Sequence, residues 1–217
     1  MCERHDSILP ETMFSRRTLL KAGAFAAFTP WSFTHSIAAE STAAANAITP
    51  ADALQRLMAG NTRYAANTPN NRDFMADRAA RAKSQFPIAA ILSCADSRVA
   101  PELAFDQNPG DLFVMRVAGN VMSPHLLASL EYGVKFLGTP LVMVLGHTNC
   151  GAVSAAISVL KDKAELPGHL SGLIEAIKPA VVQAKASQPK NLLNSAITEN
   201  VRLQVADLKQ SSPIIDK

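Results

Sequence analysis

The chain has 217 residues, 48% of them apolar, and its 21 basic and 18 acidic side chains give a net charge of +3. This length and apolar content suffice to bury one substantial core and exclude a compositionally disordered chain. The charge is small, its Lys and Arg residues are scattered, and no GxxxxGK phosphate loop or GxGxxG turn occurs. We therefore exclude nucleic acids and nucleotides as partners, and expect one domain with an appendage.

The first 47 residues have the pattern of an export signal. Arg16 and Arg17 precede a mildly apolar stretch from Ala22 to Phe33, and small residues follow up to position 47. This pattern resembles a bacterial twin-arginine signal and predicts a periplasmic protein. Pro30 interrupts the apolar stretch, which is too short to remain as a stable membrane anchor. The alternative is an amphipathic helix with two incidental arginines.

An amphipathic helix is predicted to follow this segment. Thr49 suits the N-cap and Pro50 the first helical position, so the helix begins there. Its apolar residues share one face, and Gly60 is expected to end it. The polar, Asn-rich segment that continues to about Phe74 contains no predicted element.

Three apolar runs of strand length alternate with helical patterns in the rest of the chain. The runs are Pro87–Ser93, Leu112–Val117 and Leu141–Leu145. The predicted helices are a short turn from Pro101, Pro124–Leu137, one from Gly151 onward, Leu170–Ala186 with a kink at Pro179, and Asn191–Gln210. This alternation predicts an α/β fold with a mainly parallel sheet flanked by helices. The last two helices are interpreted as packing elements without identifiable chemistry.

Side chains that bind metals follow two of the predicted strands. Cys94 and Asp96 come directly after the first strand, and His147 and Cys150 come after the third. Because parallel strands end at one edge of a sheet, we expect these side chains to converge. Thiolates and imidazole suit Zn²⁺, with Asp96 as the fourth ligand or as a gate to the fourth position. A disulfide between the two cysteines is the alternative, because the periplasm is oxidising. Removal of the signal would also remove Cys2 and leave these two as the cysteines of the mature chain.

Asp96 and Arg98 are predicted to act as a pair. Two thiolates neutralise Zn²⁺, so a water molecule at such a centre is less acidic than at a three-histidine zinc. If Arg98 holds Asp96 away from the metal, the carboxylate can accept a hydrogen bond from that water and orient it. If Asp96 binds the metal, it fills the position of the water and the site is closed.

Five ordered blocks of the sequence resemble the β-class carbonic anhydrases. The blocks are Cys94–Val99, Pro109–Phe113, Arg116–Asn120, Ser129–Tyr132 and Gly146–Ala152. Ala95 stands where the family usually has Ser, at a position that is not a ligand. The resemblance extends from about Thr49 to the C-terminus. It implies that Cys94, His147 and Cys150 bind zinc and that the chain reversibly hydrates CO₂ to bicarbonate.

The resemblance also implies a subtype. Gln85, Phe113 and Tyr132 match the substrate-pocket residues of the plant-like, constitutively open members. Allosterically closed members carry Trp three residues before the first cysteine, where this chain has Ile91. The catalytic pair is then Asp96 and Arg98, and Asp96 would bind the metal only in a closed state.

Assembly and domain limits follow from the same resemblance. It implies a homodimer or a dimer of dimers, with the N-terminal helix as an extended arm around a second subunit. From the sequence alone, packing of this helix on its own core is an equally good interpretation. The expected domains are residues 1–47, a signal peptide and linker, and residues 48–217, a β-carbonic anhydrase domain without the C-terminal strand that the family has after Ser212-Pro213.

Other functions remain open at this point. Hydrolysis of carbonyl sulfide or carbon disulfide could use the same zinc loops, and so could a non-catalytic zinc-bound structural protein. A phosphatase with a cysteine nucleophile is disfavoured, because its phosphate loop needs an arginine six residues after the cysteine. Here Arg98 lies four residues after Cys94.

Overall fold

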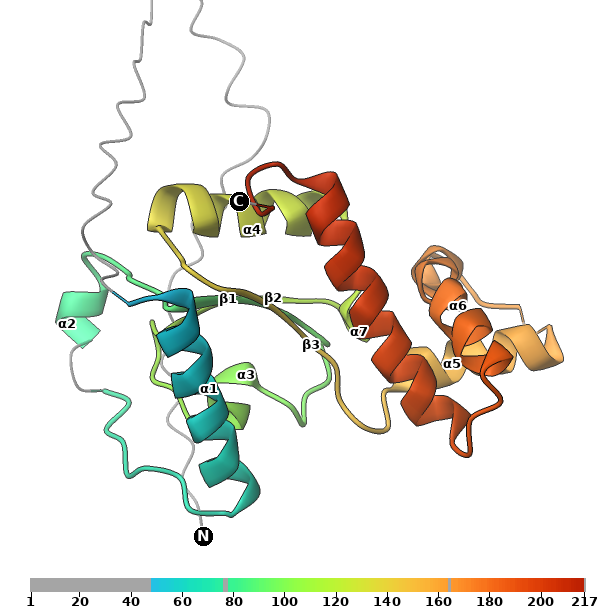
Figure 1. Cartoon of the computed structure of the whole chain (residues 1–217), viewed down its shortest axis with the longest axis horizontal. Coiled ribbons are helices and arrows are strands. Elements are labelled where there is room, and N and C mark those ends of the chain that lie inside the picture. The colour runs from blue at the N-terminus through green and yellow to red at the C-terminus, as the bar shows by residue number, and fades with distance from the viewer. Residues whose placement is uncertain (1–47, 76–77, 164, 217) are drawn as a thin grey trace, which may run out of the picture. The chain divides into compact units, whose positions relative to one another are not determined.

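A computed structural model of the chain describes residues 48–75, 78–163 and 165–216 (Figure 1). The strands are β1 (Ala89–Ser93), β2 (Leu112–Arg116) and β3 (Val142–Leu145). The helices are α1 (Pro50–Ala65), α2 (Arg78–Arg81), α3 (Pro101–Ala104), α4 (Pro124–Leu137), α5 (Gly151–Asp162), α6 (Leu170–Ala186) and α7 (Leu192–Ser211), with a 3₁₀ turn η2 (Ala118–Asn120). The predicted α/β fold is confirmed. The predicted signal lies outside the described residues.

The three strands form a parallel sheet in the order β2-β1-β3. All five residues of the central strand β1 are buried, as its continuous apolar run predicts. Ala89 and Ile91 pack in one core with α1, whereas Ala90 and Leu92 pack in another with residues of α4 and α7. Figure 1 shows α1 and α3 on one side of the sheet and α4 on the other. Helices thus cover both faces of the sheet.

α1 continues past Gly60 to Ala65, so the predicted end at Gly60 is wrong. The glycine serves close packing: a Cβ atom at this position would lie 1.7 Å from the carbonyl oxygen of Phe105. The face that carries Gly60 and Leu57 is buried against the chain's own core. Leu54 and Met58, on another face of α1, remain exposed.

Replacing Gly60 with alanine is expected to destabilise the protein by about 1–3 kcal/mol, because the added methyl group would displace α1 from the backbone of Phe105, the residue after α3. Gly172→Ala in α6 is the matched control, since a Cβ there meets no atom of the described residues within 4 Å. Alanine favours the helix, so this control should gain up to about 1 kcal/mol. Urea denaturation of the two variants measures both changes. Equal stability of the two would contradict the packing role of Gly60.

The segment between α1 and α2 is held by a buried carboxylate rather than by secondary structure. Asp106, whose side chain is 3% exposed, forms ion pairs with Arg63 of α1 and with Arg72. It also accepts a hydrogen bond from the backbone N–H of Asn70. Burial raises the pKa of Asp106, but hydrogen bonds from Arg72 and Arg63 outweigh it and lower that pKa to about 2. This carboxylate fixes a segment for which the sequence predicts no element.

The helices after β3 form a third core, which also contains Cys94 and Cys150. α6 runs through Pro179 as one helix, and its buried residues pack with those of α5 and α7. Within residues 48–75, 78–163 and 165–216, the sheet has three strands and no strand follows α7. No helix in this part of the chain combines the length and apolar character needed to cross a membrane.

Candidate metal centre

Three side chains of types that can bind metals meet at the carboxyl edge of the sheet. Cys94 directly follows the central strand β1, and His147 lies two residues beyond its neighbour β3. Cys150 is the N-cap residue of α5. The sulfur and imidazole ligand atoms of the three residues all lie within 4.8 Å of one another. The predicted convergence is therefore confirmed.

Both cysteines of the cluster are free and buried. Their Sγ atoms are 3.9 Å apart, so the structure holds two thiols and not the alternative disulfide. The hydrogen bond from Cys150 lowers the pKa of Cys94, and the backbone N–H of Gly119 adds to this effect from 3.3 Å. The pKa of Cys150 is raised by the same contact with Cys94 and by burial. One thiolate is thus favoured, and a bound cation would favour the second.

The tautomer of His147 suits metal binding. Its Nδ1 lies 2.9 Å from the carbonyl oxygen of Thr148, which can only accept, so Nδ1 carries the proton. Nε2 then presents a lone pair. This atom is buried and finds no hydrogen-bond partner in residues 48–75, 78–163 and 165–216, an arrangement that costs free energy unless something else binds there. A metal ion would satisfy Nε2, and a hydrogen bond from the other ring nitrogen to a carbonyl is the usual way of orienting a histidine ligand.

Asp96 is held beside this cluster by Arg98. The guanidinium donates to both carboxylate oxygens, at 2.9 and 2.7 Å, and the Arg98 backbone N–H donates to Oδ1 at 3.0 Å. These bonds keep the pKa of Asp96 well below its usual range. Oδ2 lies 3.8 Å from Nε2 of His147. The carboxylate therefore stays ionised, is engaged by Arg98 and remains next to the ligand cluster.

Arg116 is a structural residue of the site to which the sequence analysis gives no role. From the end of β2 it donates hydrogen bonds to the carbonyl oxygens of Cys94, Asp96 and Val99. These contacts fix the backbone of the loop that carries the first cysteine and the carboxylate. The block Arg116–Asn120 was the available signal, but its motif does not reveal a contact with backbone atoms about 20 residues upstream.

The predicted substrate-pocket residues lie away from the cluster within one chain. Phe113 pairs in register with Ala90, four residues before Cys94, which corresponds to roughly 13 Å along the strand. The ring centroid of Tyr132 lies 6.3 Å from that of Phe113, and this tyrosine is 48% exposed. A single chain therefore does not gather these two side chains around the metal ligands.

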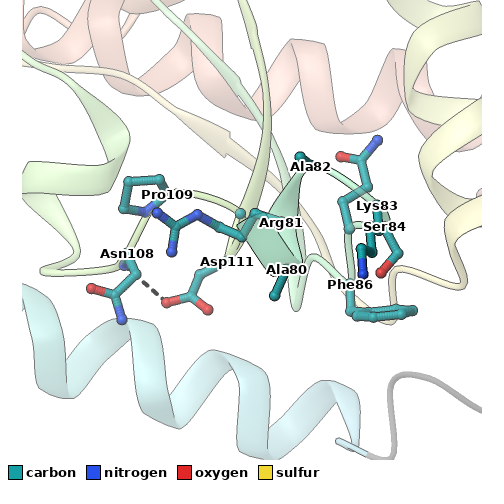
Figure 2. A pocket seen from close by; sticks show the side chains of 11 residues that line it. Ala80, Arg81, Ala82, Lys83, Ser84, Phe86, Asn108, Pro109 and Asp111 are labelled. Atoms are coloured by element: carbon teal, nitrogen blue, oxygen red, sulfur yellow. Dashed lines mark hydrogen bonds between the residues drawn. The ribbon is translucent and has the colours of Figure 1, made fainter. Parts of the chain in front are cut away.

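Gln85 is also separate from the ligand cluster. It is exposed and lines a cavity of about 760 Å³ formed by residues 80–86 and 108–111. Figure 2 shows this cavity, in which the Asp111 carboxylate accepts a hydrogen bond from the backbone N–H of Asn108. None of the lining residues belongs to the Cys-His-Cys cluster.

The fold and the cluster define a class of protein: an α/β domain with a Cys-His-Cys group that could bind a metal at the carboxyl edge of a parallel sheet. A sequence model of the family described as carbonic anhydrase matches residues 89–217. Carbonic anhydrase 2 of Mycobacterium tuberculosis is 43% identical over 134 residues, which cover 61% of this chain and 65% of that protein. A carbonic anhydrase of Mycolicibacterium smegmatis is 37% identical over 168 residues, covering 76% of this chain and 81% of the relative.

Solved structures agree with these relatives. The β-carbonic anhydrase of Coccomyxa in complex with acetazolamide has a TM-score of 0.56 and 28% identity, over 75% of this chain and 71% of that one. The chain belongs to the carbonic anhydrase family, in its β class. It spans 65% of the length of the M. tuberculosis relative.

Proposed function

We propose that this chain is a zinc enzyme that reversibly hydrates CO₂ to bicarbonate and a proton. The observation that carries the proposal is the buried cluster of Cys94, His147 and Cys150, in which Nε2 of His147 lies beside an ionised Asp96. The three residues would hold the metal, since two sulfurs and one nitrogen are a typical donor set for zinc. Bound zinc would supply an acidified water as the source of the nucleophile.

The residues around the cluster would have distinct tasks. Asp96, kept ionised by Arg98, would accept a hydrogen bond from water at the fourth ligand position and so orient its lone pair toward CO₂. The bidentate contact with Arg98 would also keep Asp96 from occupying that position, which corresponds to the open subtype. His147 would remain in one orientation through its bond to the Thr148 carbonyl. Asp96 and Arg98 are therefore the proposed catalytic pair.

We further propose that the working form is a homodimer or a dimer of dimers. Gln85, Phe113 and Tyr132 lie away from the cluster of their own chain, so a substrate-binding role requires a second copy to bring them to it. Tyr132 and Phe136 are both about half exposed, and their ring centroids lie 5.3 Å apart, which provides an aromatic surface for such contact. Sedimentation that finds only monomers in the active protein would refute this part.

The pair Arg16 and Arg17 with its apolar stretch supports the proposal of twin-arginine export to the periplasm. Fractionation of bacterial cells that express the full chain tests it. Retention of the protein in the cytoplasm in the presence of a functional twin-arginine system would refute the proposal.

Measurement of CO₂ hydration across pH, with zinc quantified per chain, tests the function. The full chain should bind about one zinc ion, and Cys94→Ala should lose both the metal and the activity, because only two ligands of the cluster remain. Gly172→Ala, which changes an open position of α6, is the control and should keep both. Hydration by Cys94→Ala equal to that of the parent would refute the proposal. Turnover of carbon disulfide, measured in parallel, distinguishes the alternative substrate.

A further inference from the structure

The buried side of α7 carries two amides. Its buried residues, Ala196, Asn200, Gln204 and Leu208, are spaced four apart and so form one stripe along the helix. Asn200 is 1% exposed and Gln204 is 7% exposed. Burying an amide costs free energy unless hydrogen bonds compensate. The interpretation of this helix as packing without chemistry therefore leaves the two amides unexplained.

Both amides bind the segment that follows β2. Nδ2 of Asn200 donates to the carbonyl oxygen of Gly119 at 2.7 Å. Oε1 of Gln204 accepts from the backbone N–H of Met122 at 2.6 Å. The sequence separation is about 80 residues in each case, so α7 fixes this segment from a distant part of the chain.

Gly119 links Asn200 to the metal centre. Its backbone N–H donates to Sγ of Cys94, while its carbonyl oxygen accepts from Asn200. Its φ of 71° and the space around it favour glycine, because a Cβ would lie 2.6 Å from Cδ1 of Ile177. The residue is thus held between α6 on one side and the Asn200 amide on the other.

Packing alone does not account for an asparagine at this position. Oδ1 of Asn200 is buried and has no hydrogen-bond partner among the residues that the structure describes, which costs free energy that a leucine of similar size would avoid. Within the described part of the chain, the amide makes one hydrogen bond, and the carbonyl oxygen of Gly119 accepts it. The hydrogen bond to the Gly119 carbonyl oxygen therefore accounts for the asparagine.

We propose that Asn200 is a positioning residue of the metal centre: it orients the Gly119 backbone so that its N–H donates a hydrogen bond to the Cys94 sulfur. The inference rests on the proposed metal binding by Cys94, His147 and Cys150. A hydrogen bond to a thiolate ligand withdraws electron density from the sulfur and restricts its position. Removal of the Asn200 donor should make the sulfur a stronger electron donor and loosen its geometry.

Cobalt substitution of the full chain tests this proposal, because Co²⁺ bound to thiolate shows a sulfur-to-metal charge-transfer band. Asn200→Leu should move this band to longer wavelength, because the sulfur becomes a stronger electron donor. It should also weaken Co²⁺ affinity by about 10- to 100-fold in competition with a chelator, because the loss of the fixed sulfur position outweighs the stronger donation. Gln204→Leu is the matched control: it removes an amide from the same stripe and a hydrogen bond to the same segment, but none to Gly119. Its band position should equal that of the parent chain.

The possible outcomes separate this inference from the proposed function. A band that stays in place in Asn200→Leu, or that moves equally in Gln204→Leu, overturns the role of Asn200 while leaving metal binding intact. Absence of any charge-transfer band in the parent chain overturns the metal centre itself. If circular dichroism shows that Asn200→Leu does not fold, Asn200→Ala provides the same comparison with a smaller side chain.

Discussion

Replacing Arg98 with methionine is expected to lower CO₂ hydration by about 100- to 1,000-fold while metal remains bound, the size of effect seen when a preorganised electrostatic contact is removed. Arg98 makes three hydrogen bonds to Asp96, two from its side chain and one from its backbone. Methionine keeps the backbone bond and the length of the side chain but removes the charge. The carboxylate is then free to approach the cluster, from which it is separated by 3.8 Å at Nε2 of His147.

The pH profile of Arg98→Met tests whether its loss of activity comes from the changed environment of Asp96. In the parent chain, Arg98 keeps the pKa of Asp96 well below its usual range, so the carboxylate is ionised throughout the neutral and mildly acidic range. Without the guanidinium, this pKa should rise toward the ordinary value of about 3.9. The acid limb of the activity profile should therefore begin at a higher pH in Arg98→Met.

Arg202→Met is the matched control for Arg98. Arg202 is also an exposed arginine with a carboxylate partner, Glu199, but its ion pair lies within α7. Its loss should leave both the rate and the pH profile unchanged, because exposed pairs of this kind contribute little. Full activity of Arg98→Met would refute the role of the Asp96 and Arg98 pair.

Asp106→Asn is expected to destabilise the fold by about 3 kcal/mol at neutral pH, the lower end of the cost of breaking a buried ion pair. The change leaves the guanidinium groups of Arg63 and Arg72 without their buried counter-charge. Asparagine also tolerates the positive φ of 48° at this position, so the backbone is not the cause of the loss. Urea denaturation measures the difference in the free energy of unfolding.

The pH dependence of this difference has a definite sign. The pKa of Asp106 is about 2 in the folded protein, below the value of about 3.9 expected in the unfolded chain. Its contribution is therefore fully present above about pH 5 and is lost as the pH falls through 4 toward 2. The stability gap between the parent and Asp106→Asn should narrow over this interval.

Asp207→Asn provides the control, because Asp207 is exposed and accepts one hydrogen bond from Ser211 within α7. Its effect should stay within about 0.5 kcal/mol at every pH. A constant gap between the parent and Asp106→Asn down to pH 2 would show that the carboxylate does not stabilise the fold through its charge.

The elements of this fold were predictable because their signals are local. The apolar run at Pro87–Ser93 predicts a strand covered on both faces, and β1 is buried at every residue. Pro124 marks the beginning of α4, and Gly138, with φ 63°, marks its end. The positions of two cluster residues were predictable for the same reason, since Cys94 and His147 lie just beyond strand ends in the sequence itself.

Local sequence patterns gave wrong or missing predictions where they do not determine the role of a residue in the fold. Gly60 reads as a helix end, but it serves the approach of α1 to the Phe105 carbonyl, which lies 45 positions further along the chain. The short helix α2 has no buried residues and therefore no apolar pattern to predict it. An isolated glycine or a polar turn does not specify which distant backbone it will meet.

The sequence by itself therefore determined the α/β class, the approximate elements and the convergence of Cys94, His147 and Cys150, because hydrophobic periodicity and motif spacing act over a few neighbouring positions. Only the tertiary structure decided the strand order β2-β1-β3, the carbonyl contacts of Arg116 and the position of Asn200 behind Gly119. The physical reason is that a polar side chain within a helix or strand has the same local pattern whether it meets water or a buried backbone atom. Packing between segments about 20 to 80 residues apart decides which of these two partners the side chain meets.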